Sequence, residues 1–317
     1  MKKIAIVIHD AGASQIILSI VKANFKKAYW YIFTPLNSPA AKIAIKNSLP
    51  IQTSSSLKEI SPNLLFFGTS WQNSFHTEFV DYAKENNITT VAFLDNWEDY
   101  KKRFDNIFPD FICVSDELAY QTAVDEGLKK LIKIKDYATM QFLNSAKKKS
   151  IKGKNSLLIL SEPTAKVAKN SFLDANYWGF TESSWVKDIL NNFKLFRCSS
   201  VTIRLHPSDT PKTYEDILKD YKEIPYNIEQ KSELIDDLLS SKVVIGINTV
   251  ALYYASLLNK VAISYIPSKI RKSNLPIAKT NQIQSLLDFD ISNFKRNDSS
   301  QIENFGIDFE TLMQRLT

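Results

Sequence analysis

Short runs of β-branched and aliphatic residues alternate with amphipathic segments along most of the chain, and this alternation constrains the fold more than any other feature. In the first half, such runs predict strands at residues 4–8, 29–33, 64–67, 90–94, 111–114 and 131–134. Helical patterns fall between them, at residues 13–23, at 75–86 and from Asp116 onwards, and another follows the strand at 131–134. Because the strand runs are apolar without interruption, they predict a parallel sheet that is covered by helices on both faces.

The alternation stops at a polar, basic segment (residues 145–155, SAKKKSIKGKN) and then begins again. The second half predicts strands at 156–160, 201–205, 243–247 and 261–265, with helices at 184–193, 214–218, 232–239 and 250–258. A chain of 317 residues suits two domains of about 150 residues each. We therefore predict an α/β fold of two Rossmann-like doubly wound domains facing a central cleft. The predicted parts are residues 1–150, residues 151–300 and a last amphipathic helix within 301–317.

Composition excludes several classes of protein. Only 7 glycines occur and none lies in a GxGxxG pattern, which argues against a dinucleotide-dependent oxidoreductase. Cys113 and Cys198 are too few for a disulfide scaffold or a multi-cysteine metal site. We predict no metal site, because the three histidines are scattered and the acidic pair Asp288 and Asp290 follows the end of the sheet pattern. We expect His76, on a polar predicted helix, to lie on the surface.

Charge and hydropathy bear on partners and location. The net charge of +6 comes from dispersed lysines without interleaved aromatic residues, so the chain does not resemble a nucleic-acid binder. No run approaches the roughly 18 apolar residues of a membrane span. The apolar run at residues 4–8 is shorter than the roughly 7–15 residues of a signal peptide. We therefore expect a cytoplasmic protein, free or in peripheral contact with the inner membrane.

Basic and polar side chains follow the predicted strand 201–205. Alternation places Arg204 and His206 on the same side of the strand, and Pro207 ends the ladder. Ligands of parallel α/β sheets bind at the carboxyl ends of the strands. The pair is either a phosphate contact or a buried polar turn.

A second anion-binding feature follows the strand 243–247. Asn248 and Thr249 are good N-cap residues for the apolar helix at 250–258. Free backbone N–H groups and the helix dipole make such an N-terminus favourable for a phosphate. His206 and this N-terminus are therefore predicted to hold one phosphate from two sides.

The segment 233–267 (ELIDDLLSSKVVIGINTVALYYASLLNKVAISYIP) resembles the C-terminal nucleotide-sugar region of GT-B glycosyltransferases. Together with His206-Pro207 it resembles the His-Pro group of bacterial sialyltransferases and Kdo transferases. The resemblance implies that His206 and Thr249 contact the phosphate of a CMP-sugar, with Asn248 beside them. It also implies that a nucleotide pocket includes Ser161, Glu162 and Pro163. Tyr254 stands where many UDP-sugar enzymes of this fold carry a glutamate for the ribose, which argues against a standard UDP-sugar site.

The carboxyl ends of the N-terminal strands offer two candidate general bases. Asp10 follows the first strand in the sequence His9-Asp10-Ala11-Gly12, where Gly12 permits a tight turn. Asp10 either deprotonates the acceptor hydroxyl or only caps the following helix. His9 and Gly12 are predicted to contact the acceptor.

The second candidate base is Asp95, which follows the strand 90–94. It lies closer to where the sialyltransferase group has its acidic motif. Trp97 is either part of an aromatic platform for a sugar or part of a packed loop. Arg103 is available to pair with a carboxylate or with an acidic acceptor. If Asp10 and Asp95 face each other, repulsion would raise the pKa of one of them.

These features predict a metal-independent GT-B glycosyltransferase without a cofactor. By resemblance it transfers an acidic sugar, a nonulosonate or Kdo, from a CMP-sugar to a bacterial surface glycan or glycolipid. His206, Thr249 and the helix N-terminus would neutralise the departing phosphate, and Asp10 or Asp95 would activate the acceptor. The alternatives are a related transferase with another donor, such as a UDP-sugar or CDP-glycerol, and a non-catalytic protein that binds a sugar phosphate.

Overall fold

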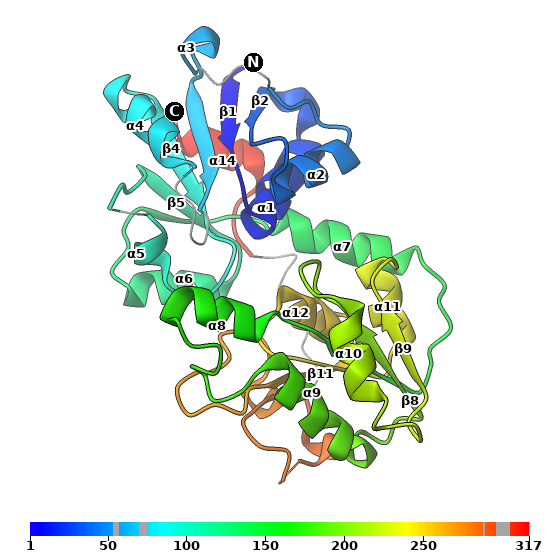
Figure 1. The fold of residues 1–317 in the computed structure, drawn as a ribbon. Helices are drawn as coiled ribbons and strands as arrows, with labels where there is room; N and C mark the ends of the chain where they lie inside the picture. Colours follow the sequence, from blue (N-terminus) through cyan, green and yellow to red (C-terminus); the bar gives the residue numbers. More distant parts are fainter. Residues whose placement is uncertain (53–56, 70–74, 105, 288, 296–304, 317) are drawn as a thin grey trace. The chain divides into compact units, whose positions relative to one another are not determined.

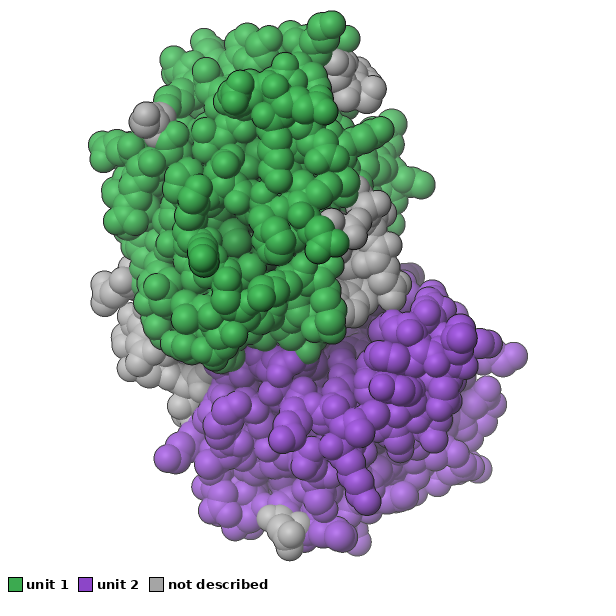
Figure 2. All heavy atoms as spheres, turned by 90° about the vertical axis from the view of Figure 1, so that its left-hand side faces the viewer, with its two compact units in different colours: residues 1–141, 300–317 green, residues 142–299 purple. Residues whose placement is uncertain are grey.

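The structure is a computed structural model, and it describes residues 1–52, 57–69, 75–104, 106–287, 289–295 and 305–316. Its residues form two compact units, which Figure 2 distinguishes by colour. Unit 1 comprises residues 1–141 and 300–317, and unit 2 comprises residues 142–299. No helix among the described residues is long and apolar enough to cross a membrane.

Unit 1 is built on a six-stranded parallel sheet of order β2-β1-β3-β4-β5-β6. Its strands are β1 (Lys3–Val7), β2 (Tyr29–Phe33), β3 (Leu64–Gly68), β4 (Thr89–Phe93), β5 (Phe111–Val114) and β6 (Leu131–Lys133). Its helices are α1 (Ala11–Ala23), α2 (Pro39–Lys46), α3 (Leu57–Ile60), α4 (Thr77–Glu85), α5 (Tyr100–Arg103), α6 (Glu117–Asp125) and α14 (Phe309–Arg315). Helix α7 (Tyr137–Lys147) runs across the boundary between the two units.

Alternation along the central strand explains why both faces of this sheet are covered. Ile4 and Ile6 of β1 belong to a buried cluster with residues of α1, α2 and α14. Ala5 and Val7, which point the other way, belong to a second cluster with residues of α4 and α6. Figure 1 shows α1 and α2 together and α4 apart from them.

Unit 2 has a second six-stranded parallel sheet, of order β12-β11-β10-β7-β8-β9. Its strands are β7 (Ser156–Leu160), β8 (Ser200–Arg204), β9 (Tyr226–Glu229), β10 (Val243–Gly246), β11 (Val261–Tyr265) and β12 (Gln282–Ile283). Its helices are α8 (Thr164–Phe172), α9 (Glu182–Asn191), α10 (Pro211–Leu218), α11 (Leu234–Ser240) and α12 (Val250–Leu257). The chain proceeds from β7 outward to β9 and then returns to β10 on the other side of β7, which is the doubly wound order.

The predicted class of fold, two doubly wound parallel sheets, is confirmed. Strands β2, β5, β7 and β11 have the predicted bounds. The elements missing from the prediction are α2, α8, β9 and β12, together with short helices. Strand β9 is an edge strand with two exposed residues, and β12 has only two residues, so neither carries an apolar run that a sequence pattern could reveal.

The boundary between the units differs from the predicted one at residue 150. It falls between Gln141 and Phe142, inside α7. Lys149, in the predicted linker, forms an ion pair with Glu233 at 2.7 Å. The last helix, α14, packs in unit 1, where Phe309 lies against Trp30 with 5.4 Å between ring centroids.

The prediction for His76 was wrong. Its residue exposure is 2%, and its ring stacks on Phe67 with 5.3 Å between centroids. The residue directly precedes α4, whose apolar face covers the sheet, so the imidazole packs on β3 instead of facing solvent.

A close approach at the end of β3 explains how α1 crosses the sheet. A Cβ atom on Gly68 would lie 2.3 Å from the Cβ of Ala13, in the first turn of α1. The absence of a side chain at Gly68 therefore allows α1 to rest on the end of β3.

We expect Gly68→Ala to lower the free energy of unfolding by about 1–3 kcal/mol, because the added methyl group pushes α1 away from β3. Urea denaturation followed by circular dichroism measures this. Gly153→Ala is the matched control, since no atom lies within 4 Å of a Cβ built there. Equal midpoints for the two variants would contradict this account of the contact between α1 and β3.

Candidate functional site

The candidate site in unit 2 lies where the strand order reverses. Strands β7 and β10 are neighbours in the sheet, but their chain connections lead away in opposite directions. Loops that follow such strands diverge and leave room for a ligand at the carboxyl edge. Ser161 and Glu162 follow β7, and Asn248 and Thr249 follow β10.

Glu162 joins the two loops. Its Oε1 accepts a hydrogen bond from the backbone N–H of Asn248 at 2.6 Å. Burial raises the pKa of Glu162 above the usual carboxyl value, while the Arg271 guanidinium and this N–H group act in the opposite direction. The Arg271 Nη2 atom lies 4.0 Å from Glu162 Oε2. Glu162 is thus a fixed, partly buried carboxylate at the centre of this edge.

Asn248 makes structural hydrogen bonds through both its backbone and its side chain. Besides its N–H bond to Glu162, its Oδ1 accepts from the N–H of Asn274 at 3.1 Å. The Thr249 side chain accepts from the N–H of Ala251 at 3.3 Å and caps α12. Asn248 therefore ties β10, β7 and the segment after β11 together.

Ser161 makes the corresponding connection to β8. Its Oγ accepts from the N–H of His206 at 2.7 Å and donates to Asp209 Oδ2 at 2.6 Å. Asp209 also accepts from the hydroxyl of Tyr214 at 2.9 Å. The loop after β7 consequently holds the backbone of His206 on one side and that of Asn248 on the other.

The imidazole of His206 is exposed and has a defined orientation. Its Nδ1 accepts from the N–H of Ser208 at 3.2 Å and lies 2.8 Å from Ser208 Oγ. With Nδ1 as acceptor, the neutral ring carries its proton on Nε2. Desolvation lowers the pKa of His206, so the neutral form predominates at neutral pH. Nε2–H is therefore a suitable donor for an oxygen of a bound anion.

The structure does not bring Arg204 to the same place as His206. The Arg204 Nη1 forms an ion pair with Asp237 of α11 and donates to the carbonyl of Ser232 at 3.0 Å. Pro163 occupies the position before α8. Nucleotide contacts by Arg204 and Pro163 stay predictions.

Tyr254 has a packing role. It is buried in α12 and stacks on Phe142 with 4.2 Å between ring centroids. The residue that replaces a ribose-binding glutamate in the sequence comparison is therefore part of the core of unit 2.

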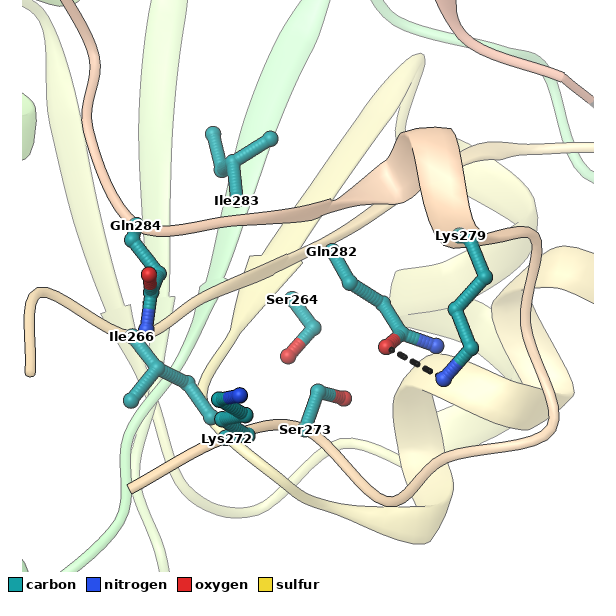
Figure 3. Close-up of a pocket in the computed structure, with 8 residues that line it drawn as sticks. All are labelled: Ser264, Ile266, Lys272, Ser273, Lys279, Gln282, Ile283 and Gln284. Atoms are coloured by element: carbon teal, nitrogen blue, oxygen red, sulfur yellow. Dashed lines mark hydrogen bonds between the residues drawn. The ribbon is translucent and has the colours of Figure 1, made fainter. Parts of the chain in front are cut away.

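A polar cavity of about 280 Å³ adjoins this edge beyond β11 (Figure 3). It is lined by Ser264, Ile266, Lys272, Ser273, Lys279, Gln282, Ile283 and Gln284. The segments that line the cavity are bonded to the loop after β10, where the strand order reverses. Ser264 Oγ donates to the carbonyl of Ile247 at 2.5 Å, and the N–H of Asn274 donates to Asn248 Oδ1.

The sequence analysis did not predict this cavity or the Arg271 side chain near it. Arg271 lies over the ring of Trp178, with its Cζ 4.3 Å from the centroid, so a loop between α8 and α9 reaches Arg271 and, through it, Glu162. Residues 266–281 contain no strand or α-helix, so no periodic pattern marked them as part of a site.

The candidate site in unit 1 is at the carboxyl edge of its sheet. His9 Nδ1 lies 2.7 Å from Asp10 Oδ1, and both side chains are partly exposed. Asp10 stands at the N-cap position of α1, but its side chain makes no capping hydrogen bond. Its carboxylate instead faces the imidazole of His9, which argues against a role as a helix cap alone.

Asp95 is held in a buried ion pair. Its Oδ1 lies 2.7 Å from Arg103 Nη1, and the two side chains are 13% and 10% exposed. Burial raises the pKa of Asp95, Arg103 lowers it, and the nearby charge of Asp10 raises it further. A Cβ on Gly12 would lie 2.1 Å from Asp95 Oδ2, so the carboxylate packs directly on the first turn of α1. His9, Asp10, Gly12, Asp95 and Arg103 thus gather at one edge.

Trp97, in the segment after β4, is anchored by a hydrogen bond. Its indole Nε1 donates to Asp116 Oδ2 at 2.8 Å. Asp116 also caps α6 through the N–H of Ala119, and burial raises its pKa to about 6. The ring is partly exposed, and a contact between it and a sugar stays a prediction.

Among the described residues, no group of three or more His, Cys, Asp or Glu side chains is arranged to hold a metal ion. Asp288, one of the acidic pair in the sequence, lies outside the described residues, and Asp290 accepts from the N–H of Ser292 at 2.9 Å.

Comparisons with known proteins give matches in structure alone. No protein-family model matches the chain, and no curated protein matches it in sequence. UDP-GlcNAc 2-epimerase from Neisseria meningitidis, solved bound to UDP-GlcNAc, is similar with a TM-score of 0.55 and 11% identity over 83% of this chain and 82% of that chain. MurG from Acinetobacter baumannii has a TM-score of 0.50 and 10% identity over 100% of this chain and 92% of the other. Alr3699/HepE from Anabaena, solved with UDP, has a TM-score of 0.52 and 9% identity over 83% and 80%.

At these levels of identity the similarity shows the fold: this chain has the two Rossmann-like domains of GT-B proteins. None of the three is a sialyltransferase or a Kdo transferase, so they support the GT-B resemblance but not that narrower group.

Proposed function

We propose that the protein is a glycosyltransferase in which unit 2 binds the nucleotide of a UDP-sugar and unit 1 binds the acceptor. The acceptor is a glycan or glycolipid hydroxyl group. The observation that carries this proposal is the hydrogen-bonded loop Ser161-Glu162, which connects His206 after β8 to Asn248 after β10 at the point where the sheet order reverses.

The geometry of this edge suits a departing phosphate. Nε2–H of His206 and the N-terminus of α12 supply hydrogen-bond donors without a metal ion. Donors fixed before the reaction stabilise charge that develops on a leaving group. Glu162, held by Asn248 and opposite Arg271, keeps the two loops in place.

The carboxyl edge of unit 1 supplies the base. Asp10 fixes Nδ1 of His9, which leaves the imidazole Nε2 to take the proton from the acceptor hydroxyl. Asp95 is less suited to this role, because Arg103 and the first turn of α1 already hold its carboxylate. Asp95 is then a positioning residue for α1 and its neighbours.

Structural similarity favours the uridine donor over the cytidine donor that the sequence resemblance implies. The similar structures from Neisseria meningitidis and Anabaena were solved with UDP-GlcNAc and with UDP, respectively. The CMP-sugar hypothesis depends on the His-Pro resemblance and on Tyr254, which stands where many UDP-sugar enzymes of this fold carry a glutamate. We therefore take UDP as the expected nucleotide and CMP as its comparison.

Thermal denaturation with UDP, CMP, GDP and ADP tests the donor class. A ligand at 100 times its Kd stabilises a protein by about 2.7 kcal/mol, so selective stabilisation is readily measured. Selective stabilisation by UDP supports the proposal, and selective stabilisation by CMP supports the CMP-sugar alternative. The absence of any nucleotide effect would contradict both. Chromatography of the sugar products then separates transfer from epimerisation.

We expect His206→Ala to weaken UDP binding by about 10- to 100-fold, the effect of losing one hydrogen bond to a charged group. Isothermal titration calorimetry measures this. The melting temperature of the free protein should hardly change, because the imidazole is exposed and, among the described residues, bonds to Ser208 of its own turn. His206→Gln, which keeps an N–H donor, is expected to recover part of the affinity. Unchanged affinity in His206→Ala would exclude His206 from the phosphate site.

A further inference from the structure

Five large apolar side chains are exposed in two segments of unit 2, the loop between α8 and α9 and the irregular segment after β11. Leu173 is 91% exposed, Ile270 62%, Phe172 44% and Tyr177 43%, and Trp178 is partly exposed. Large apolar side chains that gather on a surface mark a site of interaction. We call these five residues the aromatic-basic surface, together with three exposed lysines of the same segments, Lys169, Lys269 and Lys272.

Contacts between side chains join the two segments into one surface. The ring of Phe172 stacks on Tyr177 with 3.8 Å between centroids and lies nearly perpendicular to Trp178, with 5.8 Å between centroids. The Arg271 Cζ atom lies 4.3 Å from the centroid of Trp178, which connects the segment after β11 to the same cluster. Figure 1 shows the two segments side by side, the first in green and the second in orange. The rings are therefore held in place by one another before a partner binds.

Leu173 has a backbone conformation that is unfavourable for its residue type. It follows α8 with a φ of +62°, in the left-handed region where glycine and asparagine are favoured. Its side chain is almost fully exposed, so packing within the chain does not favour a leucine there either. Unfavourable backbone conformations of this kind are found where a residue serves a function. A contact outside the chain accounts for the leucine at this position.

The charge around these side chains is positive. Residues 164–180 and 266–274 contain five basic residues and one acidic residue, Asp174, a net charge of +4 in a chain whose total is +6. The Asp174 carboxylate accepts from the N–H of Asn176 at 2.8 Å, within its own loop. Aromatic rings beside lysines suit the headgroup region of a membrane, where the rings enter the interface and the ammonium groups reach lipid phosphates.

Arg271 also connects the aromatic-basic surface to the candidate site in unit 2. Its Nη2 atom lies 4.0 Å from Glu162 Oε2, and Glu162 bonds to the N–H of Asn248 before α12. A membrane bound at this surface would therefore lie next to the carboxyl edge of the sheet in unit 2.

We propose that the aromatic-basic surface docks on a lipid bilayer that contains anionic lipids, with Phe172, Leu173 and Tyr177 in the interface and the lysines on lipid phosphates. The sequence leaves membrane contact open, and the structure now assigns a surface and a lipid charge to it. The positive charge favours a membrane over a second copy of this chain, because the same surface of that copy carries the same charge. Binding of this kind needs no nucleotide, so the inference stands apart from the proposed function.

Flotation of the whole chain with vesicles of phosphatidylcholine, with and without phosphatidylglycerol, tests the proposal. We expect binding to be at least about 10-fold tighter when phosphatidylglycerol is present, and to weaken as the salt concentration rises.

Leu173→Asn removes the apolar contact without a cost to the fold, because asparagine suits the left-handed backbone. We expect this variant to melt no lower than the wild type and to bind anionic vesicles about 5- to 10-fold more weakly, the effect of losing a partly buried leucine side chain. Lys269→Gln/Lys272→Gln should bind about 20- to 30-fold more weakly, because each lysine near an anionic surface contributes about fivefold.

Matched controls change residues of the same type outside this surface, and they should bind vesicles as the wild type does. They are Leu287→Asn, on a leucine after β12 that is 92% exposed, and Lys187→Gln/Lys194→Gln, on two exposed lysines. If the wild type does not bind anionic vesicles, or if Leu173→Asn binds them as tightly as Leu287→Asn, the proposal is wrong. A dimer in analytical ultracentrifugation that Leu173→Asn abolishes, without vesicle binding by the wild type, would assign the surface to a second copy and overturn the proposal as well.

Discussion

Replacement of Asp95 by alanine is expected to lower the free energy of unfolding by about 3–5 kcal/mol, the range for breaking a buried ion pair. The substitution removes the carboxylate that faces the largely buried guanidinium of Arg103 at 2.7 Å. It also removes the group that packs on Gly12 at the first turn of α1. Urea denaturation followed by tryptophan fluorescence measures the loss.

The double variant Asp95→Asn/Arg103→Met separates the charge effect from a packing effect. Because it removes both charges and keeps similar volumes, we expect it to be more stable than Asp95→Ala. Asp216→Asn, which breaks the exposed pair with Lys219, is the surface control and should leave the denaturation midpoint almost unchanged. If Asp95→Ala shifts the denaturation midpoint as little as Asp216→Asn does, the pair between Asp95 and Arg103 does not stabilise unit 1.

The second large effect is expected on turnover. Asp10→Asn should lower kcat at least about 10²-fold, because an amide can donate to Nδ1 of His9 as well as accept from it, and so no longer fixes the tautomer whose lone pair is on Nε2. UDP affinity should be unchanged, since the nucleotide contacts belong to unit 2. Stability should also change little, because the Asp10 side chain makes no capping bond to α1. Steady-state release of UDP from the donor, with acceptor present, measures kcat.

His9→Gln should show the same loss of turnover, and Asp81→Asn, an exposed carboxylate on α4, should show none. Normal turnover in Asp10→Asn together with inactivity in a folded Asp95→Asn would transfer the base to Asp95. This outcome would reverse the assignment made from the hydrogen bonds.

The strands and most long helices could be predicted because their signals are local. Runs such as Ser156–Leu160 and Val261–Tyr265 are buried along their length apart from the partly exposed Val261, as expected for central strands of a parallel sheet. The sequence pattern did not predict β9 and β12, which lack such a run, because their stability comes from pairing with the neighbouring strand and not from their own side chains.

For the site, position after a strand was informative and residue type alone was not. Asp10, Asp95, Gly12 and Arg103 gather at one edge, in agreement with the parallel arrangement of the strands they follow. Arg204 also stands at the end of a strand, yet its guanidinium forms an ion pair with Asp237 of α11. An ion pair between residues far apart in the chain depends on which helix packs over which strand, and no local pattern encodes this.

By itself, the sequence determined that the chain forms two parallel sheets and that polar residues stand at the ends of their strands, because hydrophobic periodicity and turn chemistry act over a few residues. Only the tertiary structure decided the partners of those residues. The neighbouring of β7 and β10 brings Glu162 to Asn248, and the irregular segment after β11 closes a cavity around two lysines. Such contacts arise from the packing of distant elements, whose free energy is shared over many residues of the folded chain.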